Sequence, residues 1–406
     1  MAAMRAVALA ALAIVLAGCG GGASTTTAKL DGGAAELVPP NAIAFVTADA
    51  RFDSARWGTV FDLVGPVALD ADIPPAIGDQ LNLAALPGPD GPDVVAIVKP
   101  KNEAKLHQVA EGFDREGKHY TVQKVGDWSV VADSQEAFDA VRAAAAGRSL
   151  ADVDEFRGAA AHVGDDALAT AYGDGTALQQ LGGTLAELAT AAGSPKWVAA
   201  QLIPDKRAAR LELHTSAPMP PPAYRPMLLR DVPSGAIAAV SFKDADRALG
   251  NVHALDRYLG LPLKSLLPAL RGEGVAYVLS GTLIPVFVFE VESPQPAAAE
   301  RALRTAAAKS QTIPLRVTRY GSRVVLTNGS ATLKSPGGSL VDDQPFKEAL
   351  AAAGVPERVT FLAYADVQRL RPLLELLGAK TQRLEQLGDV VAFGRPSKLV
   401  VRADLK

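Results

Sequence analysis

The sequence predicts an α+β protein of two tandem homologous units, each a mainly antiparallel sheet with helices packed on a face. Three observations lead to this prediction. The chain has 406 residues, more than a single hydrophobic core usually supports. Strand-like segments alternate with amphipathic helical ones along it. Blocks of the first half also recur, in the same order, in the second half.

The recurring blocks predict a duplication with a period of about 190 residues. Residues 38–46 read VPPNAIAFV, and residues 232–240 read VPSGAIAAV. Further pairs keep the same order: residues 94–98 with 286–290, 126–131 with 321–325, 149–156 with 339–346, 170–172 with 362–364, and 205–213 with 397–401. Chance would not keep so many blocks in register. We therefore predict one repeat over residues 38–215 and a second over residues 232–406.

Each element of the first repeat has its own signal. Residues 42–47 are rich in β-formers, and the continuous apolar run at 94–98 predicts a strand covered on both faces. Residues 103–113 place apolar side chains at helical spacing. The remaining expectations are a hairpin at 120–132 turning at Gly126, a helix capped by Ser134, a short helix around Phe156, a strand at 167–172, a helix at 176–192 and a strand at 208–214. The strand order cannot be predicted.

The first residues predict a lipoprotein signal peptide over 1–18. Arg5 precedes an apolar run that is too short for the roughly 20 residues needed to cross a bilayer. Leu16, Ala17 and Gly18 lead into Cys19 and resemble a lipobox, with cleavage between Gly18 and Cys19 and acyl chains on the Cys19 thiol. The prediction is a protein anchored by lipid on the extracytoplasmic side of the cell membrane. An ordinary cleaved signal with a coincidental cysteine is the alternative.

Two connectors follow from composition. Residues 19–37 begin with small and polar side chains and are expected to form a flexible tether. Residues 216–231 contain three consecutive prolines, which fix φ and lack donors, and are expected to form a Pro-rich linker between the repeats.

Composition excludes several classes of function. The formal net charge is −3, whereas nucleic-acid binding favours clustered Lys and Arg, so nucleic acid is not expected as a partner. Cys19 is the only cysteine. Once acylated, it leaves no thiol for a disulfide, a nucleophile or a zinc site.

The search for catalytic and metal motifs predicts no enzyme, no cofactor and no metal. The sequence lacks Gly-x-Ser-x-Gly and has no serine followed three residues later by lysine. His107, His162 and His214 are interpreted as solvent-facing side chains, with no pair at metal-ligand spacing. Acidic clusters at 70–72, 152–155 and 342–343 lack a complete calcium loop, and Asp154 and Asp343 are expected to precede helices. Among the tryptophans, Trp128 is expected at an exposed hairpin tip.

The motif at Val38, repeated in degenerate form at Val232, resembles a family of bacterial envelope proteins known as domain of unknown function 3352. The resemblance covers residues 36–405 and implies a signal or anchor followed by Ala-rich α+β sequence. It implies no active site and transfers no residue roles.

Three functions stay open on the sequence alone. The first is a non-enzymatic lipoprotein whose domains bind a protein or another component of the envelope. The second is a carrier of a lipid or other apolar ligand, which a large apolar pocket would favour. The third is a hydrolase with an unrecognised site.

Overall fold

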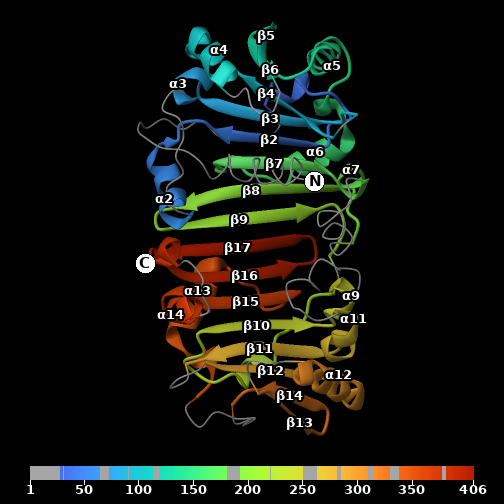
Figure 1. The fold of residues 1–406 in the computed structure, drawn as a ribbon, viewed down its shortest axis with the longest axis vertical. Helices are drawn as coiled ribbons and strands as arrows, with labels where there is room; N and C mark the ends of the chain where they lie inside the picture. Colours follow the sequence, from blue (N-terminus) through green and yellow to red (C-terminus); the bar gives the residue numbers. More distant parts are fainter. Residues whose placement is uncertain are drawn as a thin grey trace. The chain divides into compact units, whose positions relative to one another are not determined.

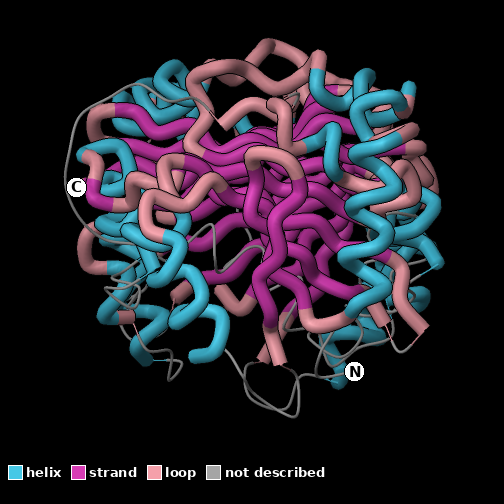
Figure 2. The backbone as a smooth tube through the Cα atoms, turned by 90° about the horizontal axis from the view of Figure 1, so that it is seen from above, coloured by secondary structure: helices cyan, strands magenta, loops and turns pink. Residues whose placement is uncertain are grey.

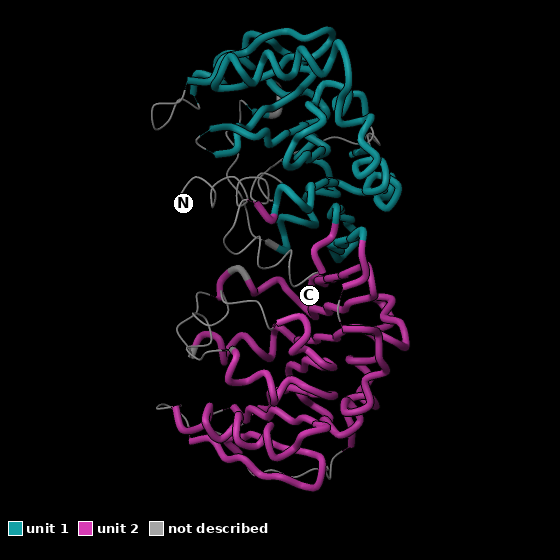
Figure 3. The backbone as a smooth tube through the Cα atoms, turned by 90° about the vertical axis from the view of Figure 1, so that its right-hand side faces the viewer, with its two compact units in different colours: residues 1–178, 196–216 teal, residues 179–195, 217–406 magenta. Residues whose placement is uncertain are grey.

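The computed structural model describes residues 28–30, 32–64, 73–89, 91–112, 119–180, 193–219, 221–249, 263–280, 285–309, 314–329, 338–376 and 381–406. The chain divides into two compact units, residues 1–178 with 196–216 and residues 179–195 with 217–406 (Figure 3). Antiparallel strands and helices make up both, which confirms the α+β class (Figure 1). Within the described part of the chain, none of the helices combines the length and the apolar character that a bilayer crossing requires.

The first unit contains a sheet of eight described strands, each antiparallel to its neighbours. The strands are β2 (Ala44–Asp49), β3 (Gln80–Leu86), β4 (Asp93–Val98), β5 (Thr121–Val125), β6 (Trp128–Ala132), β7 (Ala169–Asp174), β8 (Trp197–Asp205) and β9 (Ala208–Thr215). Across the sheet they lie in the order β5-β6-β4-β3-β2-β7-β8-β9. The expected strands therefore exist, and β4 lies in the sheet interior between β3 and β6, as its apolar run predicts.

The helices of the first unit confirm most of the predicted ones. They are α2 (Ala55–Val64), α3 (Ile73–Ile77), α4 (Glu103–Gly112), α5 (Gln135–Ala146), α6 (Asp154–Ala160) and α7 (Gly175–Gln180). The Ser134 side chain accepts a hydrogen bond from the Ala137 amide at 3.2 Å, so Ser134 caps α5 as predicted. The helix expected at 176–192 begins in α7, and residues 181–192 lie outside the described residues.

The second unit also has eight described strands in an antiparallel sheet. These are β10 (Ala238–Lys243), β11 (Glu273–Leu279), β12 (Val286–Glu292), β13 (Arg316–Tyr320), β14 (Arg323–Thr327), β15 (Phe361–Asp366), β16 (Leu387–Arg395) and β17 (Lys398–Leu405). The helices are α9 (Asp246–Leu249), α11 (Leu263–Leu266), α12 (Pro296–Lys309), α13 (Gln344–Ala353) and α14 (Val367–Leu376). Across the sheet the strands lie in the order β13-β14-β12-β11-β10-β15-β16-β17.

The two units have the same strand order. The strands correspond one to one in chain order, so that β2 matches β10 and β9 matches β17, and each matched pair occupies the same position in its sheet. Both hairpins turn on a glycine with φ of 60°, Gly126 after β5 and Gly321 after β13. This left-handed conformation is open to glycine at little cost, which explains why the Gly-containing block recurs in the sequence.

One face of each sheet is covered by helices, and we call it the covered face. In the first unit Phe156 of α6 packs edge-on against Tyr172 of β7, with ring centroids 5.2 Å apart. In the second unit Phe346 of α13 meets Tyr364 of β15 in the same way at 5.1 Å. Helices lie on either side of the strands (Figures 1 and 2). On the opposite face, α2 packs against the sheet of the first unit through Trp57, and α12 packs against the sheet of the second unit through Leu303.

Both predicted connectors extend too far into the folded units. The flexible tether predicted over residues 19–37 includes Leu30 and Ala35, yet both are fully buried on the covered face of the first unit. The linker predicted over residues 216–231 includes Tyr224 and Leu228, yet Tyr224 pairs with Val359, and Leu228 is buried in the second unit. Composition indicated mobility, but these apolar side chains stabilise the units by burial. The signal peptide, Gly18 and Cys19 lie outside the described residues.

Candidate functional site

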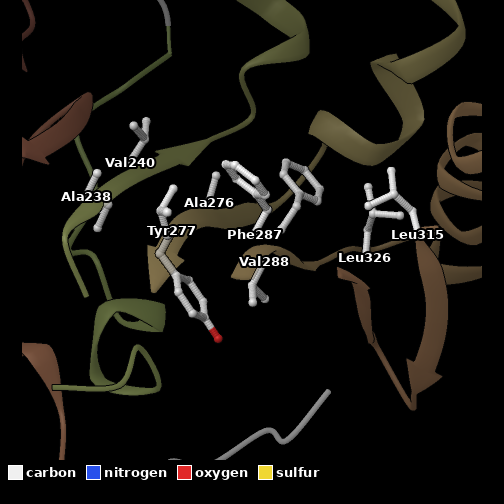
Figure 4. Close-up of a pocket in the computed structure, with 11 residues that line it drawn as sticks. Ala238, Val240, Ala276, Tyr277, Phe287, Val288, Leu315 and Leu326 are labelled. Atoms are coloured by element: carbon white, nitrogen blue, oxygen red, sulfur yellow. The ribbon is translucent and has the colours of Figure 1, made fainter. Parts of the chain in front are cut away.

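The second unit has a cavity of about 410 Å³ on the sheet face opposite its covered face (Figure 4). It is lined by Ala238, Ala239, Val240, Ala276, Tyr277, Val278, Phe287, Val288, Phe289, Leu315 and Leu326. We call this cavity the apolar groove, and the sheet side that bears Val240 and Ala276 the groove face. Val240 is 42% exposed, which is unusual for a valine in the interior of a sheet.

Strand register explains why these side chains meet. Val240 on β10 lies opposite Ala276 on β11, Ala276 opposite Phe289 on β12, and Phe289 opposite Leu326 on β14. Directly opposed residues of antiparallel strands point to the same face, so the four side chains form a row across four strands. In Figure 4, Val240, Ala276 and Leu326 point to the same side of the sheet.

Phe242 is a neighbour of Phe289, one of the residues that line the apolar groove. It lies opposite Gly274 in the register, and its ring stacks on Phe289 with centroids 5.8 Å apart. A β-carbon at Gly274 would come closer to the Phe242 ring than real β-carbons approach other atoms. The glycine is therefore required so that the aromatic ring can lie over β11.

The polar groups near the apolar groove lie on the other side of the sheet. Tyr277 points away from Ala276 toward the covered face (Figure 4), and burial, together with the charges of Glu290 and Asp231, raises its pKa to about 12. Arg323 donates to Asp231 Oδ2 at 2.7 Å and to Glu290 Oε1 at 3.2 Å. Burial raises the pKa of Glu290 despite that cation. The groove face itself offers a ligand hydrocarbon surface.

A second cavity, of about 330 Å³, differs in its chemistry. Arg225, Lys347 and Glu357 are among its lining residues, and Arg225 Nη2 lies 3.2 Å from Glu357 Oε1 in an exposed ion pair. Exposed pairs of this kind contribute little. We therefore regard the apolar groove as the candidate site.

The equivalent row in the first unit has a different composition. There Val46 on β2 lies opposite Leu83 on β3, and Leu83 opposite Ala96 on β4. Val46 is only 8% exposed, and Leu83 packs against the cluster that contains the fully buried Trp57 of α2. The larger Leu83 thus stands where the second unit has Ala276.

The histidines were predicted to face solvent, and this is wrong for His214. His107 and His162 are exposed. His214 is 8% exposed, with its Nε2 atom 3.5 Å from Glu212 Oε2, and its ring centroid lies 5.7 Å from that of His162. The alternation of β9 places His214 on the same side as the buried Glu212, which the end-of-strand position did not reveal. Within the described ranges, no three His, Cys, Asp or Glu side chains are grouped to hold a metal ion.

The acidic clusters have structural partners. Asp152 Oδ2 accepts a hydrogen bond from the Ser149 amide at 2.9 Å, and this bond lowers the pKa of Asp152. Asp154 does not precede its helix as predicted, because Val153 is the N-cap of α6; Asp154 is the first helical residue and pairs with Arg157. Asp343 precedes α13, as predicted, and accepts from the Gly235 amide at 3.2 Å. Residues 70–72 lie outside the described residues.

Trp128 was expected to be exposed at a hairpin tip, and it is half-buried instead. Its ring packs against the first unit's core, and Lys99 Nζ lies 4.5 Å from the ring centroid. Such a cation–π contact covers the face that a sugar would use. The tip position was correct, but the ring lies back on the sheet.

Sequence reasoning missed the groove residues. The sequence does contain a signal of the groove. Phe287 and Phe289 alternate on β12 and Phe242 lies on β10, whereas β11 between them carries the small residues Gly274 and Ala276. Alternation predicts which side chains share a face, but only the register shows that small residues stand between aromatic ones.

Comparison with known proteins gives little guidance. No family model matches the chain, and no curated protein matches it either, so the resemblance to domain of unknown function 3352 remains a prediction from the motif at Val38. Crystal forms I and III of the treponemal protein TP0453 are similar at 8% sequence identity and a TM-score of 0.22. The similarity covers 74% of this chain and 93% and 94% of those chains. At that TM-score it carries no argument about function.

Proposed function

We propose that this protein is a lipid-anchored protein of the extracytoplasmic membrane face whose second unit binds an apolar ligand. The observation that carries the proposal is the apolar groove of about 410 Å³ beside the exposed Val240. Small-molecule sites are concave, mostly apolar and of roughly 300–1,000 Å³, and the groove fits this description. Of the three functions that the sequence left open, the carrier has this support.

The chemistry of the lining favours a hydrocarbon ligand. Val240, Ala276 and Phe289 present carbon atoms only, and the neighbouring Tyr277 hydroxyl lies on the other side of the sheet. Burying a polar group there would cost about 1–3 kcal/mol without a compensating hydrogen bond. An apolar chain loses nothing of this kind and gains about 25 cal/mol per Å² of surface removed from water.

The proposed anchor gives such a ligand a source. Acyl chains on Cys19 would hold the mature protein at a membrane, where lipids are concentrated. The small residues before Cys19 and its status as the chain's single cysteine support this part of the proposal. Replacement of Cys19 by alanine should release the protein from membranes, and equal membrane binding and processing of the variant would contradict the anchor.

We further propose that the two units arose by duplication of one ancestral unit. Support comes from the shared strand order and from rows that correspond residue by residue, such as Val46 and Leu83 with Val240 and Ala276. The duplication matters for function because one copy can retain the packing while the other acquires a ligand site.

Photo-crosslinking tests the ligand site. The full chain would be incubated with palmitic acid that carries a diazirine, irradiated, digested and analysed by mass spectrometry. We expect modified peptides from residues 238–243 and 273–292, and competition by unlabelled palmitic acid. Modification spread evenly over the surface, or absent from these peptides, would contradict the proposal. Crosslinking of a co-purifying protein to the same peptides would instead support the protein-binding alternative.

A further inference from the structure

We infer that Ala276 determines what the apolar groove admits, and that its ligand is a single unbranched hydrocarbon chain lying across the strands. This inference rests on the proposed function and deepens it. Three features carry it: the length of the row of opposed side chains, the absence of charged side chains from the lining, and the small size of Ala276 in the middle of the row.

The length of the row matches one acyl chain. From Val240 to Leu326 the row crosses β10, β11, β12 and β14, which is three strand spacings. At about 4.8 Å per spacing the row spans about 14 Å. The hydrocarbon core of a bilayer is about 30 Å thick, so one chain in one leaflet spans about 15 Å. A chain of membrane length therefore matches the row in length, and the α12 cluster, against which Phe289 and Leu326 pack, bounds the groove at the far end.

The lining selects a hydrocarbon over a peptide. A strand laid across the groove face would bring amide and carbonyl groups against Val240, Ala276 and Phe289, none of which can pair with them. The backbone groups of β10, β11 and β12 already bond to neighbouring strands. Unpaired backbone groups are costly when buried, and a methylene chain has none.

Ala276 is the residue that gives the row its depth. It lies directly between Val240 and Phe289, and its methyl group is smaller than either neighbouring side chain, so the groove is deepest above it. In the first unit the equivalent residue, between Val46 and Ala96, is Leu83. A leucine side chain at position 276 would occupy the floor where we place the ligand.

The test compares Ala276→Leu with a matched control, Ala392→Leu. Ala392 lies in the same row two strands beyond Val240, is also half-buried, and does not line the apolar groove. Both full-length variants would be titrated with the diazirine palmitic acid. We expect apparent affinity at the 238–243 and 273–292 peptides to fall at least about tenfold in Ala276→Leu. Ala392→Leu should bind like the wild type.

Several outcomes would overturn the inference. Equal labelling of Ala276→Leu and wild type would show that the ligand does not lie over Ala276, while the proposed function would stand. Equal labelling by a diazirine-bearing sterol would contradict the unbranched chain. A wild type that labels nowhere in the groove would overturn the proposed function itself. Thermal unfolding checks that the variants fold, and the smaller change Ala276→Val replaces Ala276→Leu if the latter does not.

Discussion

The two units share a strand order but differ on the groove face. At equivalent positions Val46 is 8% exposed and Val240 is 42% exposed. In the first unit α2 has ten residues, and its Trp57, Val60 and Phe61 are buried. In the second unit the four described residues of α9 bury no side chain. A helix therefore packs on this face in both units, α2 in the first and α12 beside Leu326 in the second, and the comparison teaches that the units differ in which strands the described helices cover.

The covered faces should respond alike to mutation, and this is the largest effect we expect. Phe156→Ala and Phe346→Ala each remove a buried ring from an aromatic pair. Loss of a buried phenylalanine typically costs about 3–5 kcal/mol. Hydrogen exchange of the full chain should show each variant destabilising its own unit by a similar amount. Strong destabilisation by one variant alone would contradict the prediction that the two covered faces contribute equally to stability.

The groove faces should respond differently. Val46→Ala removes two buried carbon atoms, at about 0.8 kcal/mol each, so we expect a loss near 1.5 kcal/mol. Val240→Ala changes an exposed side chain and should cost less than about 0.5 kcal/mol. Urea unfolding of both variants, with hydrogen exchange to assign the unit affected, measures the difference. Equal costs would mean that Val240 is covered in solution.

A smaller difference between the units concerns one pair of opposed residues. In the first unit Asp174 lies opposite Trp197, and in the second unit Asp366 lies opposite Asp389. Burial raises the pKa of Asp389, the Tyr364 hydroxyl lowers it by donating at 3.2 Å, and the Asp366 charge raises it. Because the pKa of this carboxyl is higher in the folded state, its contribution to the free energy of unfolding is fully present below the unfolded-state pKa of about 3.9. That contribution is lost as the pH rises through the folded-state pKa.

Asp389→Asn removes that loss while keeping an oxygen for Tyr364. The variant should therefore gain stability over the wild type as pH rises from about 4 to neutrality, by about 1 kcal/mol or less. Thermal unfolding of both proteins across this pH range is the measurement. An advantage that shrinks toward neutral pH would show that the carboxylate is stabilised in the fold.

The sequence was sufficient for local structure and insufficient for pairing. Alternation and turn chemistry predicted the hairpin at Gly126 and the cap at Ser134, because both depend on neighbouring residues. The strand order depends on contacts between distant segments, and no local signal specified it. The buried Tyr224 was hidden in a proline-rich stretch for the same reason, since its partner Val359 lies far along the chain.

The candidate site could not be predicted from the sequence because it consists of ordinary apolar residues. Val240, Ala276 and Phe289 become a site only when the register of three strands places them in one row. The duplication did not reveal it either, because pairing residues 94–98 with 286–290 sets Ala96 against Val288, whereas the strand register makes Ala96 equivalent to Phe289. The acidic clusters drew attention instead, and there Asp152, Asp154 and Asp343 have structural partners.

The most direct test of the difference between the units is methyl NMR of the full chain with spin-labelled stearic acid. A bound spin label broadens the signals of nearby methyl groups. We predict that Ala276 and Leu326 lose intensity at low ligand concentration and that Leu83 does not. Equal broadening of Leu83 and Leu326, or no broadening of Ala276, would contradict the conclusion that the groove face of the second unit alone binds an apolar chain.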